Sequence, residues 1–263
     1  MNNLQLNELH KRQVIILDEI VRLCNAGNIK YYLLGGTLLG AIRHKGFIPW
    51  DDDLDIGMPR ADFEKFKKIA LSGELNSDFF YQDYETDKGH TMICAKIRMN
   101  NTLFVEKSVA NVNMHQGIYV DIFPLDSGDG KIRKNKNKII NRIYYHIQRR
   151  RRKNKRKIDY LLQIVPECIW IKLLNRLIKG KGEYYLNYGS QYGMVKQTIS
   201  KSHYEPSSFA VFEGKQYSIP GDYEFILRRI YGDDYLVLPP EEKRITHNPI
   251  RLSFNSNGPD EIL

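Results

Sequence analysis

Two short runs, separated by only a few residues, constrain this chain most. Residues 34–43 read Leu-Gly-Gly-Thr-Leu-Leu-Gly-Ala-Ile-Arg, and residues 48–57 read Ile-Pro-Trp-Asp-Asp-Asp-Leu-Asp-Ile-Gly. The glycine pair stands between a strand-like segment and a helix-like segment. Glycines at such a junction let backbone N–H groups approach a phosphate, and the helix N-terminus favours its charge. We therefore predict that Gly35, Gly36 and Thr37 cradle a phosphate.

The second run places four aspartates within five positions, between apolar residues. Carboxylates this close repel one another strongly unless a cation neutralises them. In a strand, Asp51, Asp53 and Asp55 would project from one face, with Leu54 and Ile56 on the other. Crowded oxygen ligands suit Mg²⁺ or Mn²⁺, which mostly serve phosphates. An isolated acidic run is more often a solvated turn, but beside the glycine turn it predicts metal-dependent phosphoryl transfer.

The arrangement resembles the DNA polymerase β-like nucleotidyltransferase superfamily and, within it, the LicD family, which includes bacterial phosphocholine transferases and relatives of fukutin. The most specific block is residues 35–56. Weaker likeness continues through Ala-Lys-Ile-Arg at 95–98, Gly-Ile-Tyr-Val-Asp-Ile-Phe-Pro-Leu-Asp at 117–126 and Tyr-Gly-Asp-Asp-Tyr at 231–235. In total the likeness covers most of residues 5–130 and 183–247.

The resemblance implies that Asp121 completes a metal triad with Asp53 and Asp55, and that these three are the catalytic residues. Asp121 stands between Val120 and Ile122, where an unpaired buried carboxylate would be costly. A structural Asp bonded to backbone beside Phe123 remains the alternative. The triad would hold one or two Mg²⁺ or Mn²⁺ ions. One carboxylate should accept the proton of the attacking hydroxyl, and both Asp53 and Asp121 stay open for that role.

Three cations are candidates for binding the donor's phosphates: Arg43, Lys96 and Arg98. Lys96 and Arg98 alternate onto one face of a predicted strand, although such a pair often faces solvent.

Residues 50–52 are assigned to the substrate side of the site. A quaternary ammonium would be bound by aromatic faces, and Trp50 is the nearest ring. Asp51 and Asp52 would be outer ligands, contacts to the acceptor or a cap at the strand start.

The sequence pattern predicts helices over residues 6 to about 27, 37–44, 60–71, 158–178 (broken at Pro166) and 222–231. It predicts strands at 31–34, 53–58, 81–84, 92–99, 103–105 and 119–123, and a hairpin over 208–219. Helices around a mixed sheet give an α/β or α+β fold, nucleotidyltransferase-like by resemblance. We expect a catalytic core at 1–130, a basic and amphipathic helical insertion at 131–182, and a C-terminal part at 183–263 that completes the catalytic domain.

The net charge of +9 is concentrated locally. Residues 131–157 contain 14 Lys or Arg and no acid, so the rest of the chain has 26 basic against 31 acidic residues, a net charge of −5. A solvated loop or a nucleic-acid contact would explain such a run. Because an amphipathic stretch follows it, we favour peripheral contact with an anionic membrane through residues 131–178, and no nucleic acid.

The remaining features indicate compartment. Three widely spaced cysteines favour a reducing environment, the first residues lack the pattern of a signal peptide, and no apolar run reaches 18 residues. The expected location is cytoplasmic, free or peripheral at the inner face of the cell membrane.

The resemblance implies transfer of phosphocholine, or a similar alcohol phosphate, from CDP-choline or another CDP-alcohol. The acceptor would be a hydroxyl of a cell-surface glycan precursor, free or lipid-linked, as in teichoic acid or lipopolysaccharide. Two alternatives remain: a true nucleotidyltransferase that releases pyrophosphate, and a non-enzymatic binder of nucleic acid or lipid.

Overall fold

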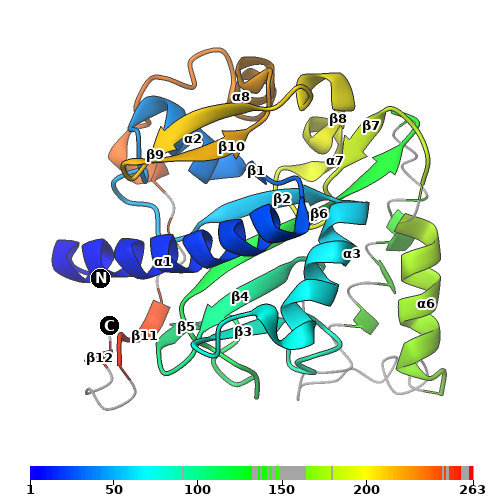
Figure 1. The fold of residues 1–263 in the computed structure, drawn as a ribbon, viewed down its shortest axis with the longest axis horizontal. Helices are drawn as coiled ribbons and strands as arrows, with labels where there is room; N and C mark the ends of the chain where they lie inside the picture. The colour runs from blue at the N-terminus through cyan, green and yellow to red at the C-terminus, as the bar shows by residue number, and fades with distance from the viewer. Residues whose placement is uncertain are drawn as a thin grey trace.

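The computed structural model describes residues 1–90, 92–131, 136, 138–140, 142–143, 146–147, 164–178, 180–244, 246, 249–255 and 261–262. Helices flank a mixed sheet, which confirms the predicted mixed α/β class (Figure 1). The main sheet has the order β1-β2-β6-β4-β3, with β7 paired to β6 and β8 paired to β7. Its strands are β1 (Tyr32–Leu33), β2 (Asp55–Pro59), β3 (Phe79–Gln82), β4 (Ala95–Met99), β6 (Tyr119–Gly128), β7 (Tyr184–Leu186) and β8 (Thr198–Ser200).

The register of the central strands brings three charged side chains into one row. β2 and β6 run parallel with Asp55 opposite Asp121, and β4 runs antiparallel to β6 with Lys96 opposite Asp121. Residues directly opposite one another project to the same face of a sheet. Asp55, Asp121 and Lys96 therefore share one face at the centre of the sheet.

The alternate residues of these strands are apolar and belong to the core: Ile56, Ile97 and Ile122 are fully buried. α1 (Asn3–Gly27) and α3 (Arg60–Ile69) pack on the central strands, and α1 lies across the sheet in Figure 1. A reciprocal pair of bonds between Asn2 and Gln5 caps the start of α1. Burial of these apolar side chains beneath the two helices stabilises the strands that carry Asp55, Asp121 and Lys96.

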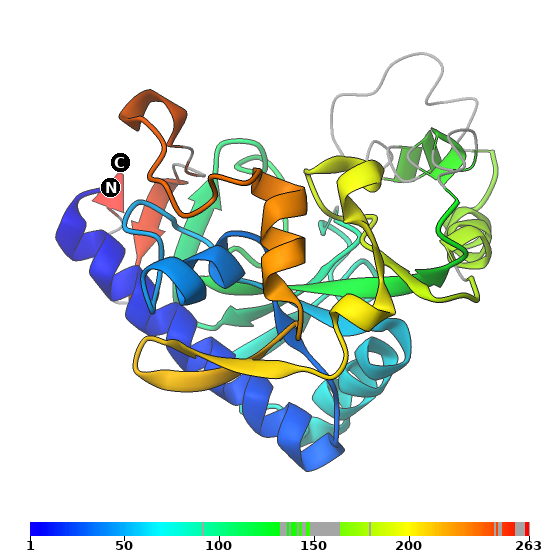
Figure 2. The same ribbon diagram turned by 90° about the horizontal axis from the view of Figure 1, so that it is seen from above.

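Beyond the β1 end of the sheet, α2, α8 and the β9–β10 hairpin lie together (Figures 1 and 2). The predicted hairpin is confirmed: Glu213 and Gly214 form a two-residue turn with positive φ at both positions. The bounds are α2 (Gly35–Arg43), α6 (Glu167–Ile178), α7 (Gly193–Gln197), α8 (Tyr223–Tyr231), β5 (Leu103–Glu106), β9 (Ser208–Phe212), β10 (Lys215–Ile219), β11 (Pro249–Ser253) and β12 (Glu261–Ile262), with short helical turns at Ala70–Glu74, Lys201–His203 and Glu241–Lys243.

Three predicted strands begin later than expected: β1 at Tyr32 rather than 31, β4 at Ala95 rather than 92, and the strand of the acidic run. The strand predicted over 53–58 begins at Asp55, and residues 51–54 form no regular structure. The N–H of Asp51 donates to the carbonyl of Ile48 in a turn, so the chain straightens only after the acidic run has started. The expectation that Asp51, Asp53 and Asp55 alternate along one strand is therefore wrong, and only Asp55 belongs to the sheet.

The predicted insertion is described only in part. Most of the basic run at 131–157, and the first half of the helix predicted over 158–178, lie outside the described residues. The second half is confirmed as α6, which starts directly after Pro166 and lies at the side of the molecule opposite the N-terminus of α1 (Figure 1). The division into three parts remains a prediction.

Candidate active site

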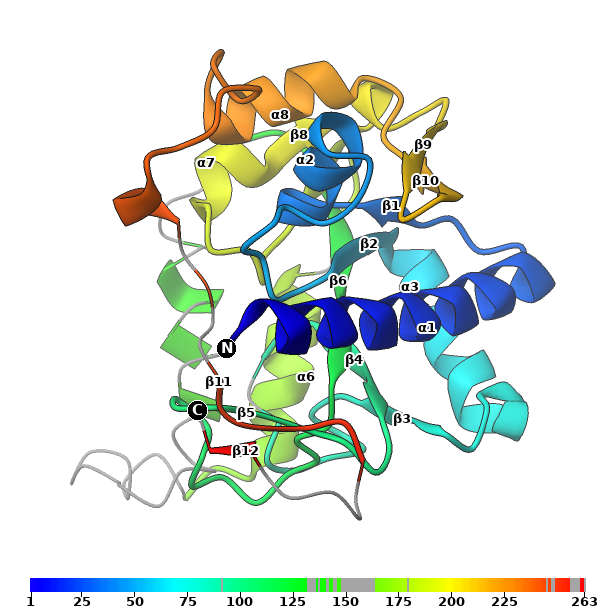
Figure 3. The same ribbon diagram turned by 90° about the vertical axis from the view of Figure 1, so that its left-hand side faces the viewer.

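The acidic run lies against the glycine turn. Gly35 has a φ of +53°, and a Cβ there would lie 3.2 Å from Oδ2 of Asp55. A Cβ on Gly36 would lie 2.6 Å from Oδ2 of Asp51. Figure 3 shows α2, which begins at this turn, next to β1 and β2. The absence of side chains at these two positions leaves the space that the two carboxylates occupy.

Thr37 positions Asp55 through the backbone. Its Oγ1 accepts a hydrogen bond from the N–H of Asp55 at 2.8 Å, and the side chain is buried. This bond ties the first turn of α2 to the first residue of β2. The hydroxyl predicted to cradle phosphate therefore holds the start of the acidic strand.

Asp121 is held by Lys96. The Lys96 ammonium lies 2.6 Å from Oδ1 of Asp121 and 3.4 Å from the centre of the Tyr119 ring. The Cys94 thiol donates to the same Oδ1 over 3.5 Å. Lys96 is 3% exposed and Asp121 5% exposed, so this pair is shielded from water. Charge interactions are stronger in such a buried environment than in water.

Burial raises the pKa of Asp55 well above its usual value, and the negative charges of Asp53, Asp121 and Asp51 raise it further. A divalent cation would relieve this repulsion, and carboxylate oxygens are the ligands that Mg²⁺ prefers. The donor chemistry therefore fits a metal. Within the described ranges, however, no three acidic, His or Cys side chains already converge as a ligand set, and the cation that Asp121 contacts is Lys96.

A cavity of about 150 Å³ opens at these acids. Asp53, Asp55 and Asp121 line it together with Gly35. The opposite wall comes from a segment near the C-terminal end of the chain: Asn187, Gly189, Ser190, Gln191, Tyr192 and Gln197, with Ile226 and Ile230 of α8. From the sequence, residues 183–263 are expected to complete the catalytic domain, but none of these wall residues was identified. The only local signal of the wall was the Gly-Ser pair at 189–190, which is typical of any turn.

The two arginines predicted to bind phosphate are occupied elsewhere. Arg98 is 2% exposed and donates to Gln82 and to the carbonyl of Gly117. Arg43 donates to the carbonyls of Tyr235 and Val237 at 3.0 and 3.2 Å. Of the three predicted cations, only Lys96 contacts a predicted catalytic acid.

Of the three residues assigned to the substrate side, Trp50 and Asp52 are in contact with other parts of the fold, and Asp51 lies at the glycine turn. The guanidinium of Arg244 lies 4.3 Å from the centre of the Trp50 ring, so it covers one face of the indole. Asp52 is 1% exposed, and its carbonyl accepts from Gln13 of α1. Asp51 lies at the glycine turn, and its carbonyl accepts from His10. Asp51 is thus the member of this set that lies nearest to the predicted phosphate cradle.

Comparison with known proteins supports the same region. Residues 28–172 match the family described as LicD/FKTN/FKRP, nucleotidyltransferase domain. The lipopolysaccharide cholinephosphotransferase LicD of Haemophilus influenzae is 28% identical over 94% of this chain and 97% of its own length. The human ribitol 5-phosphate transferase FKRP is 49% identical over 39 residues, which are 15% of this chain and 8% of FKRP. The family match spans more than half of the chain and contains the glycine turn, the acidic run and Asp121. The chain therefore belongs to the LicD family.

Proposed function

We propose that this protein transfers an alcohol phosphate, phosphocholine or a close analogue, from a CDP-linked donor to a hydroxyl of a cell-surface glycan precursor. The coarser assignment, a phosphotransferase, is supported by full-length similarity to a lipopolysaccharide cholinephosphotransferase and by local similarity to a ribitol 5-phosphate transferase. The observation that carries the proposal is the juxtaposition of Asp55 and Asp121 across β2 and β6, against the glycine turn.

In the transfer, the acceptor oxygen forms a bond to the phosphorus that carries the alcohol, and the bond from that phosphorus to the bridging oxygen breaks. CMP leaves, and a carboxylate takes the hydroxyl proton. Asp53 or Asp121 is the base, since both line the cavity. The backbone N–H groups of Gly35 and Gly36, at the N-terminus of α2, bind the diphosphate.

Asp53, Asp55 and Asp121 are the residues that would hold Mg²⁺ or Mn²⁺. When bound, the metal would neutralise charge on the diphosphate and on the leaving CMP. The Lys96 ammonium, 2.6 Å from Oδ1 of Asp121, holds this carboxylate in place in the metal-free protein.

The test is a comparison of two donors. The protein is incubated with Mg²⁺ and either CDP-choline or CTP, with and without a glycan acceptor, and CMP and pyrophosphate are measured. We expect CMP from CDP-choline or from another CDP-alcohol in a panel. Pyrophosphate from CTP would identify a nucleotidyltransferase instead, and absence of turnover with every donor would favour a binding protein.

We also propose peripheral membrane contact on the cytoplasmic side through residues 131–178. The run of 14 cations at 131–157 leads into α6, which exposes Ile169 and Leu173 beside Lys172 and Arg176. Basic and apolar residues side by side favour anionic lipid. Among the helices that the structure describes, none is long and apolar enough to cross a membrane.

A further inference from the structure

A second and larger cavity, of about 670 Å³, lies between α3, α6 and the β3–β4 connection. This volume is within the range of small-molecule sites. About half of its lining is apolar, contributed by these three elements and by the turn after α3: Phe63, Leu71, Met92, Ile171, Leu174 and Ile178 are examples. None of the residues predicted to be catalytic lines it, so the cavity is separate from the acidic site.

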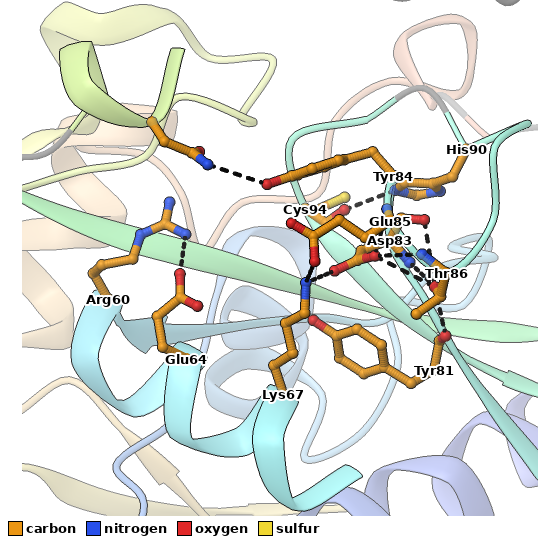
Figure 4. A network of polar contacts seen from close by, with 11 residues as sticks. Arg60, Glu64, Lys67, Tyr81, Asp83, Tyr84, Glu85, Thr86, His90 and Cys94 are labelled. Atoms are coloured by element: carbon orange, nitrogen blue, oxygen red, sulfur yellow. Dashed lines mark hydrogen bonds and ion pairs between the residues drawn. The ribbon is translucent and has the colours of Figure 1, made fainter. Parts of the chain in front are cut away.

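Most of the charged side chains that line this cavity form ion pairs (Figure 4). The Lys67 ammonium lies 2.5 Å from Asp83 and 2.7 Å from Glu85. Arg60 pairs with Glu64 on the same helix and, at 2.8 Å, with Asp126 of β6. Lys68 also lines the cavity and is exposed. An ionic ligand would have to break these pairs, at a cost in desolvation and lost charge interactions. Burial also lowers the pKa of His90, another wall residue, to about 4, so its imidazole is neutral at neutral pH.

The cavity adjoins the acidic site. Met92 lines both cavities. His90 lines the larger one and bonds through Nε2 to the carbonyl of Cys94, whose thiol donates to Asp121. One short stretch of chain thus joins the apolar wall to a predicted catalytic carboxylate. The larger cavity is therefore a neighbour of the acidic site, separated from it by Met92.

We propose that the larger cavity binds a hydrocarbon chain, acyl or isoprenoid, of an amphiphilic acceptor. The apolar part of the wall gains from burying CH₂ groups. Most of the charged groups beside it are already paired with one another, so a nucleotide or a sugar would have to compete with these ion pairs. A quaternary ammonium is disfavoured, because Lys67 already places a cation beside Asp83, Glu85 and the Tyr84 ring. The role of the chain as part of the acceptor rests on the proposed function, whereas its binding does not.

The experiment measures binding of octyl β-glucoside and methyl β-glucoside by calorimetry, below the micelle concentration and without donor or metal. The proposal expects octyl glucoside to bind and methyl glucoside to bind at least about tenfold more weakly, since each buried CH₂ contributes favourably. Equal binding of the two, or displacement of octyl glucoside by choline, would overturn it.

Two wall variants place the binding site. Ile171→Trp should fill the cavity and weaken octyl glucoside binding by about tenfold, while Ile15→Trp, on the exposed side of α1 and outside the wall, should not. Leu71→Asp, on the other wall at a side chain that is 51% exposed, provides a second test if Ile171→Trp fails to fold. A folded wall variant with unchanged binding, or an equal loss in Ile15→Trp, would overturn the proposal. Turnover of CDP-alcohols is measured in a separate assay. The binding of octyl glucoside can therefore be interpreted even if the proposed function is wrong.

Discussion

At the scale of single residues, burial and the neighbouring carboxylates disfavour the charged form of Asp55. Asp53→Asn and Asp55→Asn each remove a charge and keep the side-chain size, so we expect the fold to persist and metal-free stability to rise slightly. Turnover should fall by at least about 100-fold, because even partners of metal ligands cost 10- to 100-fold when removed. Steady-state CMP release measures this, with the exposed Asp78→Asn as control. More than a tenth of wild-type activity in both variants would contradict the metal assignment.

His90 gives the protein a pH-dependent stability. Its pKa is lowered from 6.5 to about 4 by burial. Between these pH values the unfolded state binds more protons than the folded state, so the free energy of unfolding falls as the pH drops from 6.5 towards 4. The loss should reach about 3 kcal/mol. Urea unfolding at several pH values should show a shallower fall for His90→Gln than for wild type, and parallel curves would contradict the prediction.

Tyr81 has a buried hydroxyl with no hydrogen-bond partner among the described residues. Burying an unpaired hydroxyl costs free energy, so Tyr81→Phe should leave the free energy of unfolding unchanged or raise it by up to about 2 kcal/mol. The matched control is Tyr217→Phe, since that hydroxyl donates to Asp18 at 2.8 Å and its loss should cost about 1 kcal/mol. Chemical denaturation measures both. A larger loss in Tyr81→Phe than in Tyr217→Phe would contradict the assignment.

At the scale of elements, α2 contains two glycines whose replacement should have different effects, Gly36 on turnover and Gly40 on stability. A Cβ on Gly36 meets the Asp51 carboxylate at 2.6 Å, whereas a Cβ on Gly40 meets the backbone carbonyl of Gly46 at 2.5 Å. Gly36→Ala should move a side chain in the site and lower turnover by about 100-fold with the fold intact. Gly40→Ala should instead lower stability, by about 1–3 kcal/mol. Thermal unfolding and CMP release together distinguish the two, and normal activity in Gly36→Ala would remove Asp51 from the site.

Elements with strong periodicity were predictable from sequence, and those defined by long-range pairing were not. The apolar stripe of α1 and the turn between β9 and β10 are local signals, and both elements were predicted correctly. The start of β2 was misplaced because a local turn at Asp51 delays the strand. β7 and β8 were missed because strands of three residues gain their stability from pairing, β7 with β6 and β8 with β7, and no local pattern encodes these contacts.

At the scale of the whole molecule, the site is assembled from distant parts of the chain. The acidic run was noticed because four aspartates in five positions are unusual in any sequence, whereas the role of Asp121 was assigned through the family resemblance. Their juxtaposition depends on the parallel register of β2 and β6, and the opposite wall of the cavity comes from residues after 186. Sequence alone also gave Arg98 and Arg43 a phosphate role, whereas the folded chain uses both for carbonyl contacts. The sequence shows which residues are charged, but the groups that they contact are known only from the folded structure.

The basic run tests how the whole molecule meets a membrane. Its 14 cations are separate in sequence from every proposed catalytic residue, so replacing Arg149, Arg150, Arg151 and Arg152 by Gln should spare transfer to a small soluble acceptor. Binding to anionic vesicles should weaken by about 1 kcal/mol per removed charge at low salt. The difference from wild type should shrink as salt rises, because screening already weakens the wild-type attraction. Vesicle sedimentation measures this, with neutral vesicles as control. If the quadruple variant sediments with anionic vesicles as wild type does at low salt, the basic run is no membrane anchor. If the variant instead loses activity on the soluble acceptor to the same extent as it loses vesicle binding, these arginines belong to the active site.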